Sequence, residues 1–235
     1  MDSTWIGLFV GLSLLTYAMY HAPALQRSGK LDQLARKGNF CNVLDTIPQT
    51  VAGKQVIFEI MSNTCEDGMP HTTNVETIRF PESLWKQRDT ERFRKVLRHE
   101  LIHLKQRQYP TAWRILYKKW GYSILNNPPS GVPSSIVERV RYNPDIADAP
   151  WALWKDRYVS VACYKSTTQP TLRDTEIVIW DLQAGKQVEK MPEDWPWNGL
   201  HQAEHPHEIS AEMAADLEHA SYVPTGFVEF LKMQV

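Results

Sequence analysis

The chain has 235 residues, enough for one large domain or a medium domain with an extension. Its hydrophobic share of 43% and charged share of 23% are ordinary for a globular protein, which excludes a disordered or fibrous chain. The net charge of −1 leaves the molecule without polycationic character, so we expect no nucleic acid among its partners.

The N-terminal stretch Thr4–Tyr20 (TWIGLFVGLSLLTYAMY) contains no charged residue and has about the minimum length of a bilayer-spanning helix. No Lys or Arg precedes it and no A-x-A site follows it, which favours an anchor over a cleaved signal peptide. A buried or partner-binding helix is a third reading. We expect residues 1–22 to be a single-pass membrane anchor or signal-like segment. The basic residues that follow favour a cytoplasmic location for the rest of the chain; they are Arg27, Lys30, Arg36 and Lys37.

Three cysteines, Cys41, Cys65 and Cys163, have spacings that match no zinc knuckle and no disulfide framework. A pair between Cys41 and Cys65 is an option that the sequence leaves open. We expect a mainly reduced protein whose cysteines do not bind zinc.

The elements of the first half begin after a basic linker over 23–50. Val51–Met61 is rich in β-branched and aromatic residues and predicts a strand, and Asn74–Pro81 alternates apolar with polar residues and predicts a second. Glu82–Gln108 lacks Gly and Pro, and its apolar residues recur on one helical face, so it predicts a helix that ends before Pro110. A further helix is expected over Thr111–Leu125.

The second half begins with a proline-rich loop, NNPPSGVPSS, which is a candidate internal boundary. A β-rich insertion is expected at about 140–190, where RYVSVACYK and TEIVIWDL alternate as strands do. The irregular, tryptophan-rich segment MPEDWPWNG follows, and a helix starts near Pro206. The order of elements predicts an α+β fold with a mixed β-sheet, in one domain over 51–235.

The motif HELIH, His99–His103, carries the chemistry. Residues four apart lie on one face of a helix, so His99 and His103 project side by side and offer two imidazole ligands to zinc. Glu100 is displaced around the helix and is expected to act as general base toward a metal-bound water. The non-functional alternative is a surface helix on which both histidines are solvated.

A catalytic zinc needs a third protein ligand, and the region HQAEHPHEISAEMAAD, His201–Asp216, offers candidates. Glu208, Glu212 and Asp216 are spaced by four and share a helical face. An acidic solvated face is the ordinary interpretation of such a pattern. In the functional interpretation, Glu208 is the third zinc ligand, and Glu212 accepts a hydrogen bond from the ring nitrogen of His99 or His103 that does not face the metal.

HELIH followed downstream by HEISAE resembles the gluzincin class of zinc metalloproteases. The form E-I-S-A-E is similar to the glutamate helix of lethal-factor-like toxins, and HPHEI to small bacterial and phage-type HExxH proteins. The resemblance implies a zincin-like domain, a Zn²⁺ cofactor, metal ligands His99, His103 and Glu208, and Glu100 as base. It covers two short helices, which are separated by 105 residues from His103 to Glu208. A register with Glu212 as ligand and Asp216 behind it also satisfies the pattern.

Enzymes of this kind often stabilise the oxyanion of the tetrahedral intermediate with a Tyr or His. His205 and His201 precede the glutamate helix and are the candidates here, with Tyr158 and Tyr164 as looser ones. We expect the strand Thr77–Phe80 to be the sheet edge that pairs with an extended substrate.

Three hypotheses of function remain. The first is a membrane-anchored zinc peptidase that acts on a peptide or protein substrate. The second is a non-catalytic structural protein of the same fold at a membrane or particle surface, with or without zinc. The third is an interaction module that binds no metal and uses MPEDWPWNG as its partner surface.

Overall fold

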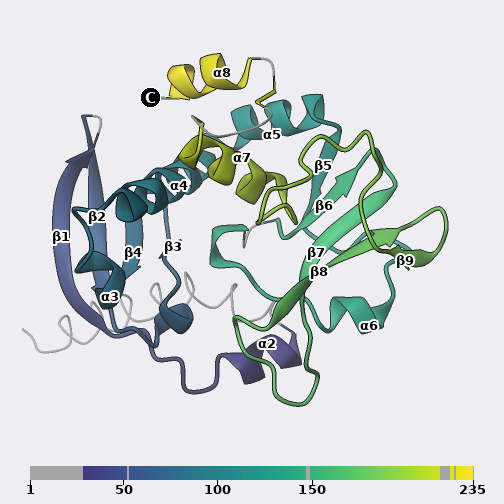
Figure 1. Cartoon of the computed structure of the whole chain (residues 1–235), viewed down its shortest axis with the longest axis horizontal. Coiled ribbons are helices and arrows are strands. Elements are labelled where there is room, and N and C mark those ends of the chain that lie inside the picture. The colour runs from purple at the N-terminus through teal and green to yellow at the C-terminus, as the bar shows by residue number, and fades with distance from the viewer. Residues whose placement is uncertain (1–28, 52, 147–148, 218–222, 225, 235) are drawn as a thin grey trace, which may run out of the picture.

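The computed structural model describes residues 29–51, 53–146, 149–217, 223–224 and 226–234. Two β-sheets lie on either side of a central pair of helices, α4 (Glu91–Gln108) and α7 (Pro206–Ala215), which pack against each other (Figure 1). The expected N-terminal apolar helix over 1–22 falls outside these ranges. Within them, no helix is long and apolar enough to cross a bilayer.

The first sheet has four strands in the order β1-β2-β4-β3 and packs against α4. β1 and β2 form an antiparallel hairpin, β4 runs parallel to β2, and β3 is antiparallel to β4. The strands are β1 (Val43–Val51), β2 (Lys54–Met61), β3 (His71–Thr72) and β4 (Thr77–Pro81). The ring of Phe80 on β4 lies 5.0 Å from that of Phe93 on α4, centroid to centroid, so the helix is held against the sheet by aromatic packing.

This sheet corrects two expectations. Part of the expected linker over 23–50 forms α2 (Lys30–Ala35) and most of β1. β1 was missed because nearly all of its side chains are exposed, so no apolar alternation marks it, and Pro48 is tolerated there because β1 is an edge strand. The expected substrate-binding edge, Thr77–Phe80, lies inside the sheet, because β3 pairs with β4.

The second sheet is a five-stranded antiparallel meander in the order β5-β6-β7-β8-β9. Its strands are β5 (Tyr122–Leu125), β6 (Trp151–Trp154), β7 (Tyr158–Tyr164), β8 (Thr175–Asp181) and β9 (Lys186–Val188). The helix expected over Thr111–Leu125 is wrong in its second half. α5 (Pro110–Lys119) ends before Gly121, whose φ of +86° leaves the helical region, and the chain continues as β5.

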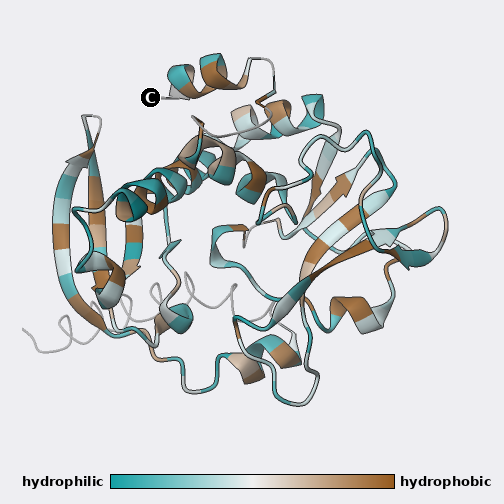
Figure 2. Cartoon of the chain, in the orientation of Figure 1, coloured by the Kyte–Doolittle hydropathy of each residue, from teal (hydrophilic) through white to brown (hydrophobic). Residues whose placement is uncertain are grey.

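Shorter helices complete the chain. They are α3 (Glu82–Trp85), α6 (Ser134–Val137), α8 (Phe227–Gln234) and the 3₁₀ turns Cys65–Gly68 and Pro144–Ile146. Hydrophobic residues run along β2 and β4 in the first sheet and along β7 and β8 in the second (Figure 2). Trp195 and Trp197 of the expected partner surface are instead buried, at 5% and 3% exposure, in the core beneath α5 and α7.

A disulfide joins Cys41 to Cys65, which corrects the expectation of a mainly reduced protein. The bond ties the segment before β1 to the 3₁₀ turn that starts at Cys65. Cys163 on β7 is free and buried.

Candidate metal centre

The motif histidines lie on a face of α4 that is free of the first sheet, because the apolar face of the helix packs against that sheet. The Thr90 hydroxyl caps the helix by accepting the Phe93 backbone N–H at 3.2 Å. Phe93 and Leu104 are buried against the first sheet. His99 and His103 project from the helix beside α7, with His103 fully buried and His99 half-buried.

α7 brings a carboxylate to these histidines. The helix starts at Pro206, a residue suited to the first helical position, and buries Ile209 and Met213 in the core. Glu208 lies in the first turn of α7, on the side that faces α4. Its Oε2 lies 3.2 Å from His99 Nε2 and 3.4 Å from His103 Nε2.

The three side chains fit a tetrahedral zinc ion. Zinc bonds of 2.0–2.1 Å in tetrahedral geometry separate the ligand atoms from one another by about 3.3 Å. Here the two Nε2 atoms are 2.9 Å apart, and each lies 3.2–3.4 Å from Glu208 Oε2. The chemistry of the set, two imidazoles and one carboxylate, is that of catalytic zinc sites, which leave a fourth position open.

Two further side chains hold the ligands in place. Gln106 Oε1 lies 2.8 Å from His103 Nδ1, while Gln106 Nε2 donates to the His207 carbonyl and the Ser210 hydroxyl. Because its amide nitrogen is already donating, Gln106 accepts from Nδ1–H, and this leaves Nε2 of His103 as a lone-pair ligand. Asn143 Nδ2 donates to Glu208 Oε1 at 2.7 Å, so the other oxygen, Oε2, is turned to the histidines.

Sequence reasoning missed both residues. The contact of Gln106 could have been predicted from the sequence, because position i+3 from His103 lies on the same helical face. Asn143 carried no such signal, since it comes from a loop 65 residues before Glu208.

The electrostatics of the cluster suit a cation. Burial disfavours the charged imidazole of His103, but the carboxylates of Glu208, Asp145 and Glu100 together outweigh burial and raise the His103 pKa to about 10. Burial also acts to raise the pKa of Glu208, yet the two histidines hold that pKa well below its usual range. The carboxylate therefore draws positive charge to this point, and a metal ion is positioned to take the place of the histidine proton.

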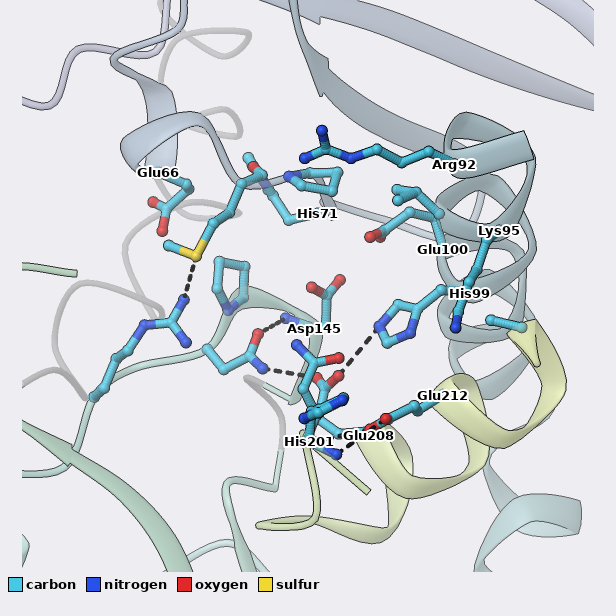
Figure 3. Close-up of a pocket in the computed structure, with 18 residues that line it drawn as sticks. Glu66, His71, Arg92, Lys95, His99, Glu100, Asp145, His201, Glu208 and Glu212 are labelled. Atoms are coloured by element: carbon cyan, nitrogen blue, oxygen red, sulfur yellow. Dashed lines mark hydrogen bonds and ion pairs between the residues drawn. The ribbon is translucent and has the colours of Figure 1, made fainter. Parts of the chain in front are cut away.

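The cluster opens into a cavity of about 360 Å³ bounded by α4, α7, the segment before β3 and the loop that contains Asn143 (Figure 3). Glu100 projects into this cavity from α4 and faces Asp145 (Figure 3). The Glu100 side chain is buried and its Oε2 has no hydrogen-bond partner. Burial, and then the Asp145 charge, raise the pKa of Glu100 well above its usual value.

The other predicted site residues have different roles from those expected. His205 does not line the cavity: it is the N-cap of α7, where Nδ1 accepts the His207 N–H and Nε2 lies 3.1 Å from the Ala149 carbonyl. Glu212 contacts neither ligand histidine through a hydrogen bond. Its two oxygens accept the backbone N–H groups of His201 and Gln202, so it fixes the loop before α7.

His201 itself lies on the cavity wall and is exposed. The looser candidates are packed away from the cavity: Tyr164 is buried and donates to Asp32, and Tyr158 packs against Trp154.

In comparisons with known proteins, no family model, no curated protein and no solved structure matches the chain.

Proposed function

We propose that the protein is a zinc-dependent peptidase in which His99, His103 and Glu208 hold the metal and Glu100 is the general base. One observation carries the proposal. The three ligand atoms form a triangle with sides of 2.9–3.4 Å, at the wall of a cavity into which Glu100 also projects.

A zinc ion held by these residues would polarise a water molecule and a substrate carbonyl, and would lower the pKa of the water toward ~7. Glu100 supplies the proton transfer. Its unpartnered Oε2 is available to accept a proton from a water in the cavity, and the same carboxyl can then protonate the leaving amine. A bound cation beside Glu100 also favours its ionised form, which offsets the effect of burial on its pKa.

The test compares wild type with Glu100→Gln. We expect both proteins to bind one zinc per chain in elemental analysis. We expect only the wild type to cleave a mixed peptide library, with a rate at least ~100-fold above that of the variant, as removal of a general base predicts. Glu91→Gln is the matched control, because Glu91 lies on α4 but pairs with Arg94 and Arg98 on the exposed side.

The alternative is a non-catalytic protein of the same fold. Stoichiometric zinc without cleavage of any peptide by the wild type would favour that alternative. Absence of zinc binding would reject the peptidase and favour a zinc-free structural protein or an interaction module.

A further inference from the structure

We propose that Arg141 binds a carboxylate of the substrate, either a chain terminus or an Asp or Glu side chain close to the scissile bond. This inference deepens the proposed peptidase function and rests on it. The carboxylate is the chemistry common to both sources, and the experiment below separates them.

Arg141 belongs to a short loop segment, Arg141–Asp145, that forms one wall of the cavity and enters the 3₁₀ turn Pro144–Ile146. Arg141 and the run Asn143–Asp145 line the cavity, whereas the ring of Tyr142 packs under the guanidinium of Arg36.

The segment is fixed at both ends. The Arg141 N–H donates to the Ala162 carbonyl of β7 at 2.8 Å. Asp145 Oδ1 accepts the backbone N–H and the hydroxyl of Thr72 at 2.7 and 2.6 Å. Since Asn143 between them bonds the zinc-ligand candidate Glu208, the Arg141 side chain starts from a backbone position tied to the metal cluster.

Among the residues that the structure describes, none offers the guanidinium of Arg141 an anionic hydrogen-bond partner. Its Nε is buried without a hydrogen bond, and its Nη2 contacts the Met69 sulfur, a weak acceptor, at 3.5 Å. No ion pair or hydrogen bond joins it to the buried carboxyl of Glu204, although Arg141 is near enough to act against the burial that raises the Glu204 pKa to about 7. A buried charged donor left unpaired is unfavourable, and a planar guanidinium pairs best with a carboxylate through two parallel hydrogen bonds.

Most other charges around the cavity already have partners within the described residues. Glu66 pairs with Arg36, Lys95 with Asp216, and Asp145 with Thr72. Besides Glu100, the wall side chain without such a partner is Arg92, which extends from α4 on the same side of the cavity as His71 (Figure 3). Apart from Glu100, which is assigned as the base, and Asp145, whose partner Thr72 is neutral, the charged wall side chains without a partner in the described residues are therefore Arg92 and Arg141. Two free guanidinium groups favour an anionic group on the substrate over an amine.

The experiment uses peptide pairs that differ by one charge. Around a sequence that the wild type cleaves, Glu is compared with Gln at each position, and a free C-terminus is compared with an amide. We expect one position or the free terminus to raise kcat/KM by ~10- to 100-fold, the range of a hydrogen-bonded charge pair. Arg141→Gln should abolish this preference mainly through KM and leave the neutral peptide within about 3-fold of wild type.

Arg141→Lys should retain part of the preference, because it keeps the charge without the fork. Arg114→Gln, on the exposed face of α5, removes the same charge away from the cavity and should change nothing. Zinc content and circular dichroism of each variant show whether the metal site and the fold persist. Cleavage by wild type without any charge preference, or a preference that survives in Arg141→Gln, would overturn the inference and leave the peptidase function standing.

A binding assay keeps the two proposals separate if no peptide is cleaved. Fluorescence anisotropy of labelled Glu and Gln peptides, on zinc-loaded wild type and Arg141→Gln, should show tighter binding of the acidic peptide only to the wild type. Equal affinities would overturn the carboxylate site, whatever the outcome for catalysis.

Discussion

At the scale of single residues, Gln106 links the cluster of His99, His103 and Glu208 to the hydrophobic core. It bridges His103 to Ser210, and the Ser210 hydroxyl lies 3.0 Å from the Tyr117 hydroxyl, which is fully buried. A histidine ligand keeps its orientation and tautomer through the partner of its second nitrogen. Here that partner is an amide whose other end is held by α7.

Substitution Gln106→Leu should lower zinc affinity by ~10- to 100-fold, because the Nδ1–H of His103 loses its acceptor and the ring is free to turn. Competition with a chromophoric chelator measures this change. Gln108→Leu is the control, since Gln108 lies on the same helix and donates to the Val75 carbonyl outside the cavity. Unchanged affinity in Gln106→Leu would show that packing alone orients His103.

At the scale of elements, the sequence predicted helices that depend on neighbouring residues, and it missed positions that depend on contacts between distant parts of the chain. The helix with HELIH and the helix after Pro206 follow from periodicity and capping residues. Thr90 nevertheless starts a new helix inside the expected run of 82–108, because its side chain caps the chain there. Asn143 and Arg141 could not be placed from sequence, since their positions depend on pairing with β7 and on the distant Glu208.

The N-cap of α7, His205, should make the stability of the protein depend on pH. Burial is the main cause that lowers the His205 pKa to about 4, whereas an unfolded histidine titrates near 6.5. The neutral ring caps α7 through Nδ1, so protonation removes the cap. Stability from this group is present above pH 6.5 and is lost as pH falls toward 4, by up to about 3 kcal/mol.

Urea unfolding of metal-free protein between pH 7.5 and pH 4 (about the window of this titration) measures the effect. His205→Asn keeps an oxygen acceptor at the cap and does not titrate, so its free energy of unfolding should fall less than that of wild type over this range. Other buried histidines, His71 and His207, contribute equally to both proteins. Identical pH profiles would show that protonation of the His205 ring does not destabilise the folded state, so that the cap contributes nothing to stability.

At the scale of the whole molecule, the cavity is assembled from distant parts of the chain. α4 supplies His99, His103 and Glu100, α7 supplies Glu208, and the segment between the sheets supplies Arg141. Glu66, adjacent to the disulfide-bonded Cys65, completes the rim opposite α7. The Cys41–Cys65 bond therefore stabilises one side of the cavity. A disulfide is typical of an oxidising compartment, whereas the basic residues after the expected N-terminal anchor predicted the cytoplasmic side.

This disulfide can be tested together with the buried thiol of Cys163. In denaturant without reductant, one thiol per chain should react with a thiol reagent, and three should react after reduction. In the native protein none should react, because burial raises the pKa of Cys163 to about 12. The bond closes a loop with a sequence separation of 24, so reduction should lower the free energy of unfolding by about 3 kcal/mol. Cys163→Ala should keep this dependence on reductant, whereas Cys41→Ser should lose it. Three reactive thiols in the unreduced chain would contradict the bond and remove the argument for an oxidising compartment.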